Sequence, residues 1–393
     1  MKIVLTSLLT ALCLVTSAQE GTQKIDSLLS ELDKAKNQLE KIEITFELCE
    51  THESFEEQLV YSKYAIELSE DTRNSKYKAM SYGMMAKVLE TNKEIGEAVN
   101  WKLKEIKNWE KTGYKIELAN AYMSLGGLYE KLGSSSEAQV AYESSLEIFK
   151  RENNFEGLAR VKDKLGILHK NLNDLTNALE LYYEALQIER EKGLSELEAN
   201  TLLHIGVIHK LKKDYDLAKS FYQKALDKFR TINSKSGIGR TSNNLGNVYR
   251  EQENYDQALT YYNSALVIFQ DLKDYQRQAK ALNNKGLVNE SLERYPQALE
   301  NFNQSLALKL EEKSIYHVAT TYANMASVYG KQGNYAKAEE YLSMAMAHAT
   351  KYNLHEEKAE VFRLNAEYHE SRGNWSKALT LFKEYLAYED SII

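Results

Sequence analysis

The sequence is poor in residues that break helices or cross-link chains. Its 393 residues include one proline and two cysteines. Proline interrupts helix interiors, so its scarcity favours long uninterrupted helices. Two cysteines cannot staple a small domain with several disulfides. After the N-terminal stretch, no run reaches the roughly 18 apolar residues of a membrane-spanning helix. We therefore expect an all-α chain without a later membrane span.

Catalytic signatures are also missing. The sequence has no Walker-type phosphate loop and no HExxH, GxSxG or CxxC motif. His169, His209 and His369 occupy one position of a repeat in which tyrosine is usual, which favours a structural role over metal binding. We expect no enzyme activity, no metal site and no cofactor. A net charge of −7 and a pI near 5.8 argue against nucleic acid as a partner.

Residues 1–18 have the pattern of a secretory signal peptide. A basic start at Lys2 precedes an apolar stretch, and small residues follow at Thr16 and Ala18. This pattern predicts cleavage before Gln19 and an exported protein, either periplasmic or secreted.

The two cysteines lie in different settings. Cys13 follows Leu12, where a lipoprotein signal has a small residue, so we expect no lipid anchor. Cys49 lies in a predicted helix and is expected to be a small buried hydrophobe.

Residue types recur every 40 residues along most of the chain. One position is small: Ala86, Gly126, Gly166, Gly206, Gly246, Gly286, Ala326 and Ala366. Twelve residues on, the position is alanine: Ala98, Ala138, Ala178, Ala218, Ala258, Ala298, Ala338 and Ala378. Sixteen residues on, it is bulky except at Lys102: Tyr142, Tyr182, Tyr222, Tyr262, Phe302, Leu342 and Phe382. A fixed period without insertions is typical of a solenoid.

The small position has a physical reason. Glycine in a helix interior costs about 1 kcal/mol relative to alanine, so we expect it where a neighbouring helix approaches closely. Leu245, Gly246 and Tyr249 share one face of a first helix, and Ala258 and Tyr262 share one face of a second. Each repeat is thus predicted to be a helical hairpin whose small positions receive large side chains. Such hairpins must stack to bury their faces.

The pattern of Leu245-Gly246, Tyr249, Tyr255, Ala258, Tyr262 and Ala265 resembles the tetratricopeptide repeat family, in a 40-residue version. The resemblance implies an α-solenoid of stacked helical hairpins, a right-handed superhelix that binds proteins or peptides. It covers residues 77–393 as eight repeats. Residues 19–76 would hold an N-terminal helix and a degenerate capping repeat.

A partner would meet the first helix of each hairpin, on the face that points away from the packing glycine. Ten residues on this face are candidates for a peptide-binding groove: Arg160, Lys170, Asn200, Lys210, Arg240, Asn243, Asn247, Arg250, Lys280 and Asn283. The asparagines would hydrogen-bond a peptide backbone, and the basic residues would pair with its carboxylates. The alternative, ordinary solvated charges on exposed helix positions, stays open.

The asparagines also resemble part of the carboxylate clamp of chaperone-binding tetratricopeptide domains. Asn243, Asn247 and Asn283 fit that pattern, but Thr320 and Asn324 stand where its basic pair follows. This departure argues against a C-terminal carboxylate as the ligand.

The overall layout resembles the exported sensory region of Bacteroidetes-type histidine kinases and transcriptional regulators. The chain ends in Ser391-Ile392-Ile393 without a polar capping helix. Two functions stay open: a periplasmic protein-binding scaffold that acts as the sensor module of a signalling protein, and a freestanding secreted adaptor for envelope protein complexes. The sequence does not assign an oligomeric state.

Overall fold

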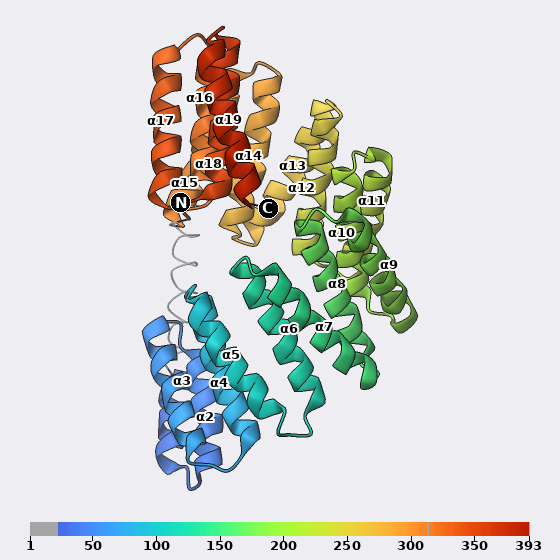
Figure 1. Cartoon of the computed structure of the whole chain (residues 1–393), viewed down its shortest axis with the longest axis vertical. Helices are drawn as coiled ribbons and strands as arrows, with labels where there is room; N and C mark the ends of the chain where they lie inside the picture. The colour runs from blue at the N-terminus through green and yellow to red at the C-terminus, as the bar shows by residue number, and fades with distance from the viewer. Residues whose placement is uncertain (1–22, 313, 393) are drawn as a thin grey trace, which may run out of the picture. The chain divides into compact units, whose positions relative to one another are not determined.

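The computed structural model describes residues 23–312 and 314–392, and these residues form helices and turns without a strand (Figure 1). The prediction of an all-α chain is therefore confirmed. A first helix covers residues 23–34, within the range 19–76 where the sequence predicts an N-terminal helix. The predicted signal peptide, residues 1–18, lies outside the described residues.

The remaining helices pair as consecutive hairpins (Figure 1). Their bounds are α2 Gln38–Thr51, α3 Phe55–Glu70, α4 Ser75–Thr91, α5 Ile95–Trp109, α6 Lys115–Lys131, α7 Ser135–Arg151, α8 Phe155–Asn171, α9 Leu175–Lys192, α10 Ser195–Leu211, α11 Tyr215–Thr231, α12 Lys235–Glu251, α13 Tyr255–Asp271, α14 Tyr275–Ser291, α15 Tyr295–Glu311, α16 Val318–Lys331, α17 Tyr335–Lys351, α18 His355–Ser371 and α19 Trp375–Ile392.

Most turns between helices share one local geometry. Between α12 and α13, Glu253 adopts a left-handed conformation with φ 59°, and the N–H of Asn254 donates to the carbonyl of Tyr249 at 2.8 Å. The Asn254 side chain then accepts the N–H of Gln257 and caps α13. Pro296 lies in the first turn of α15, where its missing N–H costs nothing.

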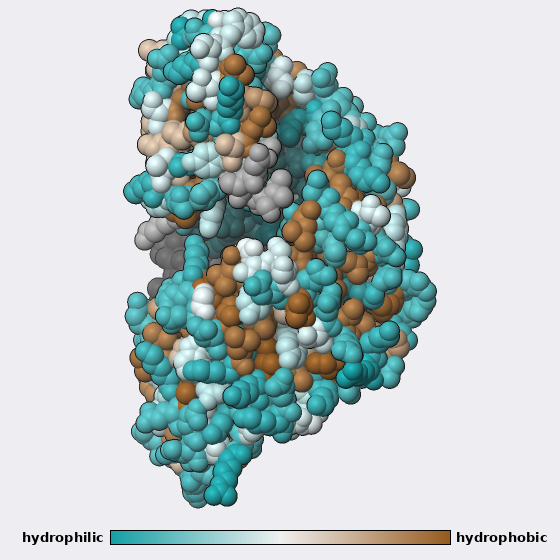
Figure 2. All heavy atoms as spheres, in the orientation of Figure 1, coloured by the Kyte–Doolittle hydropathy of each residue, from teal (hydrophilic) through white to brown (hydrophobic). Residues whose placement is uncertain are grey.

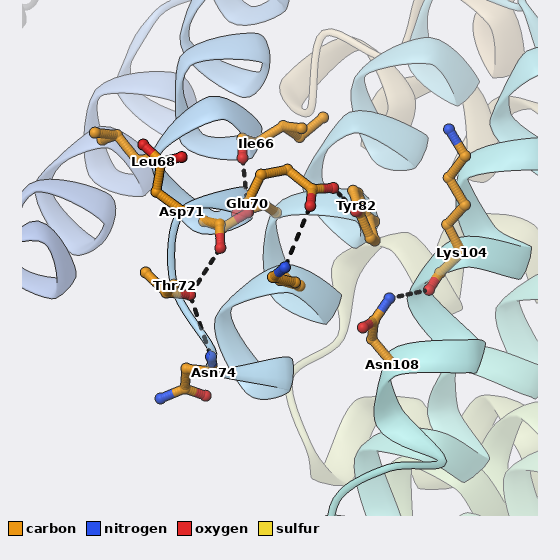
Figure 3. A network of polar contacts seen from close by, with 12 residues as sticks. Ile66, Leu68, Glu70, Asp71, Thr72, Asn74, Tyr82, Lys104 and Asn108 are labelled. Atoms are coloured by element: carbon orange, nitrogen blue, oxygen red, sulfur yellow. Dashed lines mark hydrogen bonds and ion pairs between the residues drawn. The ribbon is translucent and has the colours of Figure 1, made fainter.

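The turn between α3 and α4 shows how side chains replace missing backbone bonds (Figure 3). Thr72 donates to the carbonyl of Ser69 at 2.7 Å and accepts the N–H of Asn74. Glu70 accepts hydrogen bonds from Tyr82 and Lys78 of α4. Burial and the bond to Glu70 raise the pKa of Tyr82 to about 12. These contacts fix the angle at which α4 leaves α3.

The predicted fit of large side chains onto small positions is confirmed. A Cβ atom on Gly126, Gly206 or Gly246 would lie 2.6 Å from a ring atom of Tyr142, Tyr222 or Tyr262, respectively. On Gly286 it would lie 2.4 Å from Phe302. The approaching group is therefore the ring sixteen residues on, from the second helix of the same hairpin.

A second set of aromatic rings joins consecutive hairpins. Phe229, at the end of α11, would lie 2.2 Å from a Cβ atom on Gly237 of α12. Phe149 would crowd Gly157 in the same way. These rings join α7 to α8 and α11 to α12, and the repeated alanines such as Ala258 are completely buried.

The chain divides into two compact units. One comprises residues 1–171, described from residue 23, together with 183–188, and the other comprises 172–182 and 189–393, so α9 contributes to both. We describe each unit by itself. The continuity of the array from one unit to the other stays a prediction.

The exposed surface is mainly hydrophilic on the face shown in Figure 2. An apolar stripe nevertheless runs along α19, where Trp375, Leu379, Phe382 and Leu386 are all exposed. In the part of the chain that the structure describes, no helix combines the length and the apolar character needed to cross a bilayer.

Candidate functional site

In the second unit, the first helices of successive hairpins lie side by side. Helix α10 contacts α12, α12 contacts α14, and α14 contacts α16. The second helices of these hairpins make no comparable contacts with one another among the described residues. The first helices therefore pack more closely against one another than the second helices do. We call the solvent-facing surface of these first helices the first-helix face. Helices α10, α12 and α14 carry eight of the ten predicted groove residues.

Arg240 of α12 reaches across to α10. Its guanidinium donates to the side-chain oxygen of Asn200 at 2.6 Å and lies over the ring of Phe229. Burial and the nearby Arg277 lower the pKa of Arg240, and Glu196 acts against them. Arg240 forms no ion pair with a described residue, so its charge is only partly compensated.

Asn243 and Asn247 are joined to α14 through one side chain. The Asn284 amide donates to the side-chain oxygens of Asn243 and Asn247 at 3.2 and 3.1 Å, and Tyr262 donates to Asn247 at 2.8 Å. Asn243 is only 6% exposed. The structure thus places Asn243 inside the packing of α12 against α14 instead of on an open surface.

Lys280 and Asn283 both lie on α14, about one helical turn apart. Asn283 accepts long hydrogen bonds, both 3.4 Å, from Thr321 and Asn324 of α16. Lys280 is exposed and forms no ion pair among the described residues. Arg250, on α12, also lacks an ion-pair partner among them. In contrast, Lys210 pairs with Glu251 at 3.3 Å.

Arg160 and Lys170 belong to the other unit. Arg160 is exposed and pairs with Glu156, one turn earlier in α8. Lys170 is half-buried, and this burial lowers the pKa of its ammonium group. Their place relative to the second unit is not described, so their membership of the same groove stays a prediction.

A pocket of about 430 Å³ opens beside α14, α15 and residues 314–317, which the sequence pattern does not predict. We call it the Lys309 pocket. Its lining is Tyr275, Gln276, Arg277, Lys280, Asn283, Asn284, Leu308, Lys309, Glu312, Ser314, Tyr316, His317 and Thr320. One signal could have revealed it: Lys309 stands 40 residues after Phe269 and 80 after Phe229, in a position where aromatic rings pack.

Lys309 is buried at the base of this pocket, only 8% exposed. Its ammonium donates to the carbonyl of His317 at 2.9 Å and to the hydroxyl of Thr321 at 2.6 Å. Burial lowers the pKa of Lys309 to about 8, although the charge of Glu357 acts in the opposite direction. The Glu357 carboxylate itself accepts the backbone N–H of His317.

The described histidines do not assemble a metal site. No group of three or more His, Cys, Asp or Glu side chains with metal-binding geometry occurs in residues 23–312 and 314–392. His209 is buried and stacks on Phe221 with ring centroids 5.4 Å apart. The pKa of His369 is lowered mainly by burial.

Several solved structures share this fold. The apo form of RapI has a TM-score of 0.57 and 20% identity, over 70% of this chain and 99% of its own. A Rap protein complexed with competence and sporulation factor has a TM-score of 0.61 and 13% identity, over 94% and 99%. The Rap conjugation gene regulator of plasmid pLS20, in complex with the Phr* peptide, has 0.56 and 15%, over 84% and 95%. Identities this low support the fold alone.

A search of curated protein sequences finds no match. Family models do match. The tetratricopeptide repeat models cover residues 119–151, 157–231, 237–311 and 317–388, more than half of the sequence. The chain therefore belongs to the tetratricopeptide repeat family.

Proposed function

We propose that the first-helix face of the second unit binds an extended peptide or protein segment that carries carboxylate groups. The observation that carries this proposal is the set of cations without ion-pair partners among the described residues: Arg240, Arg250 and Lys280. Two other cations on these first helices are paired: Lys210 of α10 with Glu251 at 3.3 Å, and Lys235 of α12 with Asp271 at 2.5 Å. An anionic partner would supply the missing counter-charges.

The comparisons support a peptide as the partner. Two of the similar solved structures are complexes, one with competence and sporulation factor and one with the Phr* peptide. A stacked-hairpin protein also offers a long continuous face, which suits an extended ligand. This chain is proposed to act as a binding scaffold without catalytic activity.

Binding of two synthetic peptides tests the proposal. One alternates Glu and Ser, and the other alternates Gln and Ser, so they differ in charge but closely match in size. We expect the full chain to bind the acidic peptide at least ~10-fold more tightly, with an affinity that falls as salt rises. Arg240→Glu combined with Arg250→Glu should remove this preference.

A matched control carries the same charge change on a second helix. Lys224→Glu with Arg230→Glu alters two cations of α11 in the same unit. The control should keep the preference of the wild type. Equal binding of both peptides, or equal loss in both double variants, would show that the cations of the first-helix face are only solvated charges.

We also propose that the protein is exported. The signal-peptide pattern of residues 1–18 supports this, and a native protein that begins at Gln19 by mass spectrometry would bear it out. A sensor role and a freestanding adaptor role remain the two candidates for the exported protein. A native gene that continues into an apolar segment and a kinase or DNA-binding domain would favour the sensor.

A further inference from the structure

The Lys309 pocket arises where the 40-residue pattern changes locally. Helices α10, α12, α14 and α18 begin at residues 195, 235, 275 and 355, so the period predicts a helix start at 315. Helix α16 instead begins at Val318, and His317 adopts a left-handed conformation with φ 60°. The missing first turn contributes the non-helical residues 314–317 to the wall of the pocket.

The change at residue 309 adds charge to this pocket. Forty and eighty residues before Lys309, the rings of Phe269 and Phe229 are fully buried, and the position 120 residues before it holds the buried Glu189. Lys309 places an ammonium group there instead. A buried ammonium is unfavourable unless its charge and its donors are compensated. An aliphatic or aromatic side chain would be the simpler way to fill this position.

The compensation within the described residues is incomplete. A lysine ammonium has three donors, and two of those of Lys309 reach neutral oxygens, on His317 and Thr321. No carboxylate forms an ion pair with Lys309 among the described residues. Glu357 is close enough to influence the charge but is engaged with the backbone of His317. One donor of Lys309 thus has no partner among the described residues, and its charge is balanced only in part, by the nearby Glu357 carboxylate.

The residues that line the pocket also favour a negatively charged ligand. Lys280 and Arg277 of α14 line the pocket, and only one carboxylate, that of Glu312, does so. Arg277 already pairs with Asp274, so Lys280 and Lys309 are the cations left for a ligand. The amide groups of Asn283 and Asn284 add polar contacts. A volume of about 430 Å³ accommodates an amino-acid-sized group.

We infer that the Lys309 pocket binds one carboxylate group, held by Lys309 at its base and Lys280 at its rim. This inference rests on the proposed peptide-binding function, because the peptide partner carries the carboxylate. Two sources share this chemistry, an acidic side chain and a chain terminus. The pocket therefore acts as the anchor point of the bound peptide, while Arg240 and Arg250 contact charges further along it.

Small peptides distinguish the two sources. The probes are an acetylated dialanine with a free C-terminus, an acetylated and amidated dipeptide with one glutamate, and acetylated, amidated dialanine as the neutral reference. Inorganic phosphate is the fourth probe. Binding to the full chain is followed by NMR of ¹³C-labelled lysine side chains, with the Lys309 signal identified by its loss in Lys309→Met.

We expect at least one carboxylate probe to bind and to raise the pKa measured for Lys309, while the neutral peptide does neither. Lys309→Met should weaken this binding at least ~10-fold. Lys285→Met is the matched control, because Lys285 is a half-buried lysine of α14 that does not line the pocket. It should leave binding unchanged. If Lys309→Met fails to fold, Lys280→Gln, at an exposed position, should still weaken binding several-fold.

Three results would overturn the inference: binding of phosphate alone, equal binding of the neutral peptide, or unchanged binding in both Lys309→Met and Lys280→Gln. Its failure is separable from that of the proposed function. A long acidic peptide that depends on Arg240 and Arg250 but not on Lys309 would overturn only the pocket. Carboxylate probes that bind while long acidic peptides do not would support the pocket and overturn the peptide-binding face.

Discussion

Gly126 faces the ring of Tyr142 so closely that a Cβ atom on Gly126 would lie 2.6 Å from two of its ring carbons. The next residue, Gly127, faces the same side chain at an ordinary distance, with its added Cβ 3.7 Å from the Tyr142 hydroxyl. The two glycines therefore form a matched pair within α6. One is required by packing, and the other is not.

We predict opposite effects for alanine at these two positions. Gly126→Ala should destabilise the protein by about 1–3 kcal/mol, because the ring of Tyr142 must move within a packed core. Gly127→Ala should stabilise it by about 0.5–1 kcal/mol through helix propensity. Urea denaturation monitored by circular dichroism measures both. Equal effects of the two substitutions would contradict the assigned role of the ring.

Asn283 and Asn284 provide a second matched pair. Asn284→Ala should cost about 1–3 kcal/mol, because the buried oxygen of Asn243 loses its donor. Asn283→Ala should cost less than about 1 kcal/mol, since its two bonds to α16 are long at 3.4 Å. The measurement is again the free energy of unfolding. A larger loss at Asn283 would show that the contacts to α16 matter more than those to α12.

Lys309 should make stability depend on pH in the alkaline range. Its pKa of about 8 in the folded chain lies below the ordinary value of 10.5, so the folded state releases this proton first as pH rises. The cost of burying the charge is fully present below pH 8 and declines up to pH 10.5. By linkage it amounts to at most about 3 kcal/mol.

The comparison of wild type with Lys309→Met isolates this effect. The free energy of unfolding of the wild type minus that of Lys309→Met should increase between pH 8 and pH 10, by roughly 1–3 kcal/mol. The other titrating groups largely cancel in this difference. Lys285→Met serves as the reference for a less buried lysine. A difference that stays flat across this range would mean that Lys309 keeps its proton in the folded state.

Cys49 should be unreactive in the folded protein. Its side chain is 2% exposed, its thiol donates to the carbonyl of Gln58 at 3.3 Å, and burial raises the pKa of the thiol to about 11. The prediction of a buried hydrophobe is confirmed. In a Cys13→Ser variant at pH 8, iodoacetamide should modify Cys49 at least ~100-fold more slowly than in urea. Mass spectrometry follows the reaction, and comparable rates in both conditions would contradict this burial.

The fold could be predicted because the residue types at fixed positions of each repeat determine how its helices pack. A glycine at position 246 and a tyrosine at position 262 indicate that the tyrosine ring packs on the glycine. The same pair of residue types recurs every 40 residues and predicts the same contact in other repeats. The class of fold, the hairpin and the meeting of small with large side chains could all be predicted. Among α4 to α19, the helix start departs from the 40-residue spacing only at Val318, where the pattern is locally broken.

The candidate site was harder to predict, for a geometric reason. The position of a residue around its own helix shows which side chains avoid the partner helix of its hairpin. It does not show contacts with the first helix of the next hairpin, and these contacts bury Asn243 against Asn284. The Lys309 pocket depends on a helix turn that does not form, and the periodicity hinted at it only through the lysine at the position of Phe229 and Phe269.

The extensive helix contacts within each unit join helices that are adjacent or next but one in the chain. A growing polypeptide with this pattern need not wait for distant segments before it folds. Each hairpin can close soon after its residues emerge from the ribosome, and it can then serve as the template for the next. The hairpins can therefore assemble in the order in which they are synthesised. Little apolar surface is then exposed to solvent at any stage.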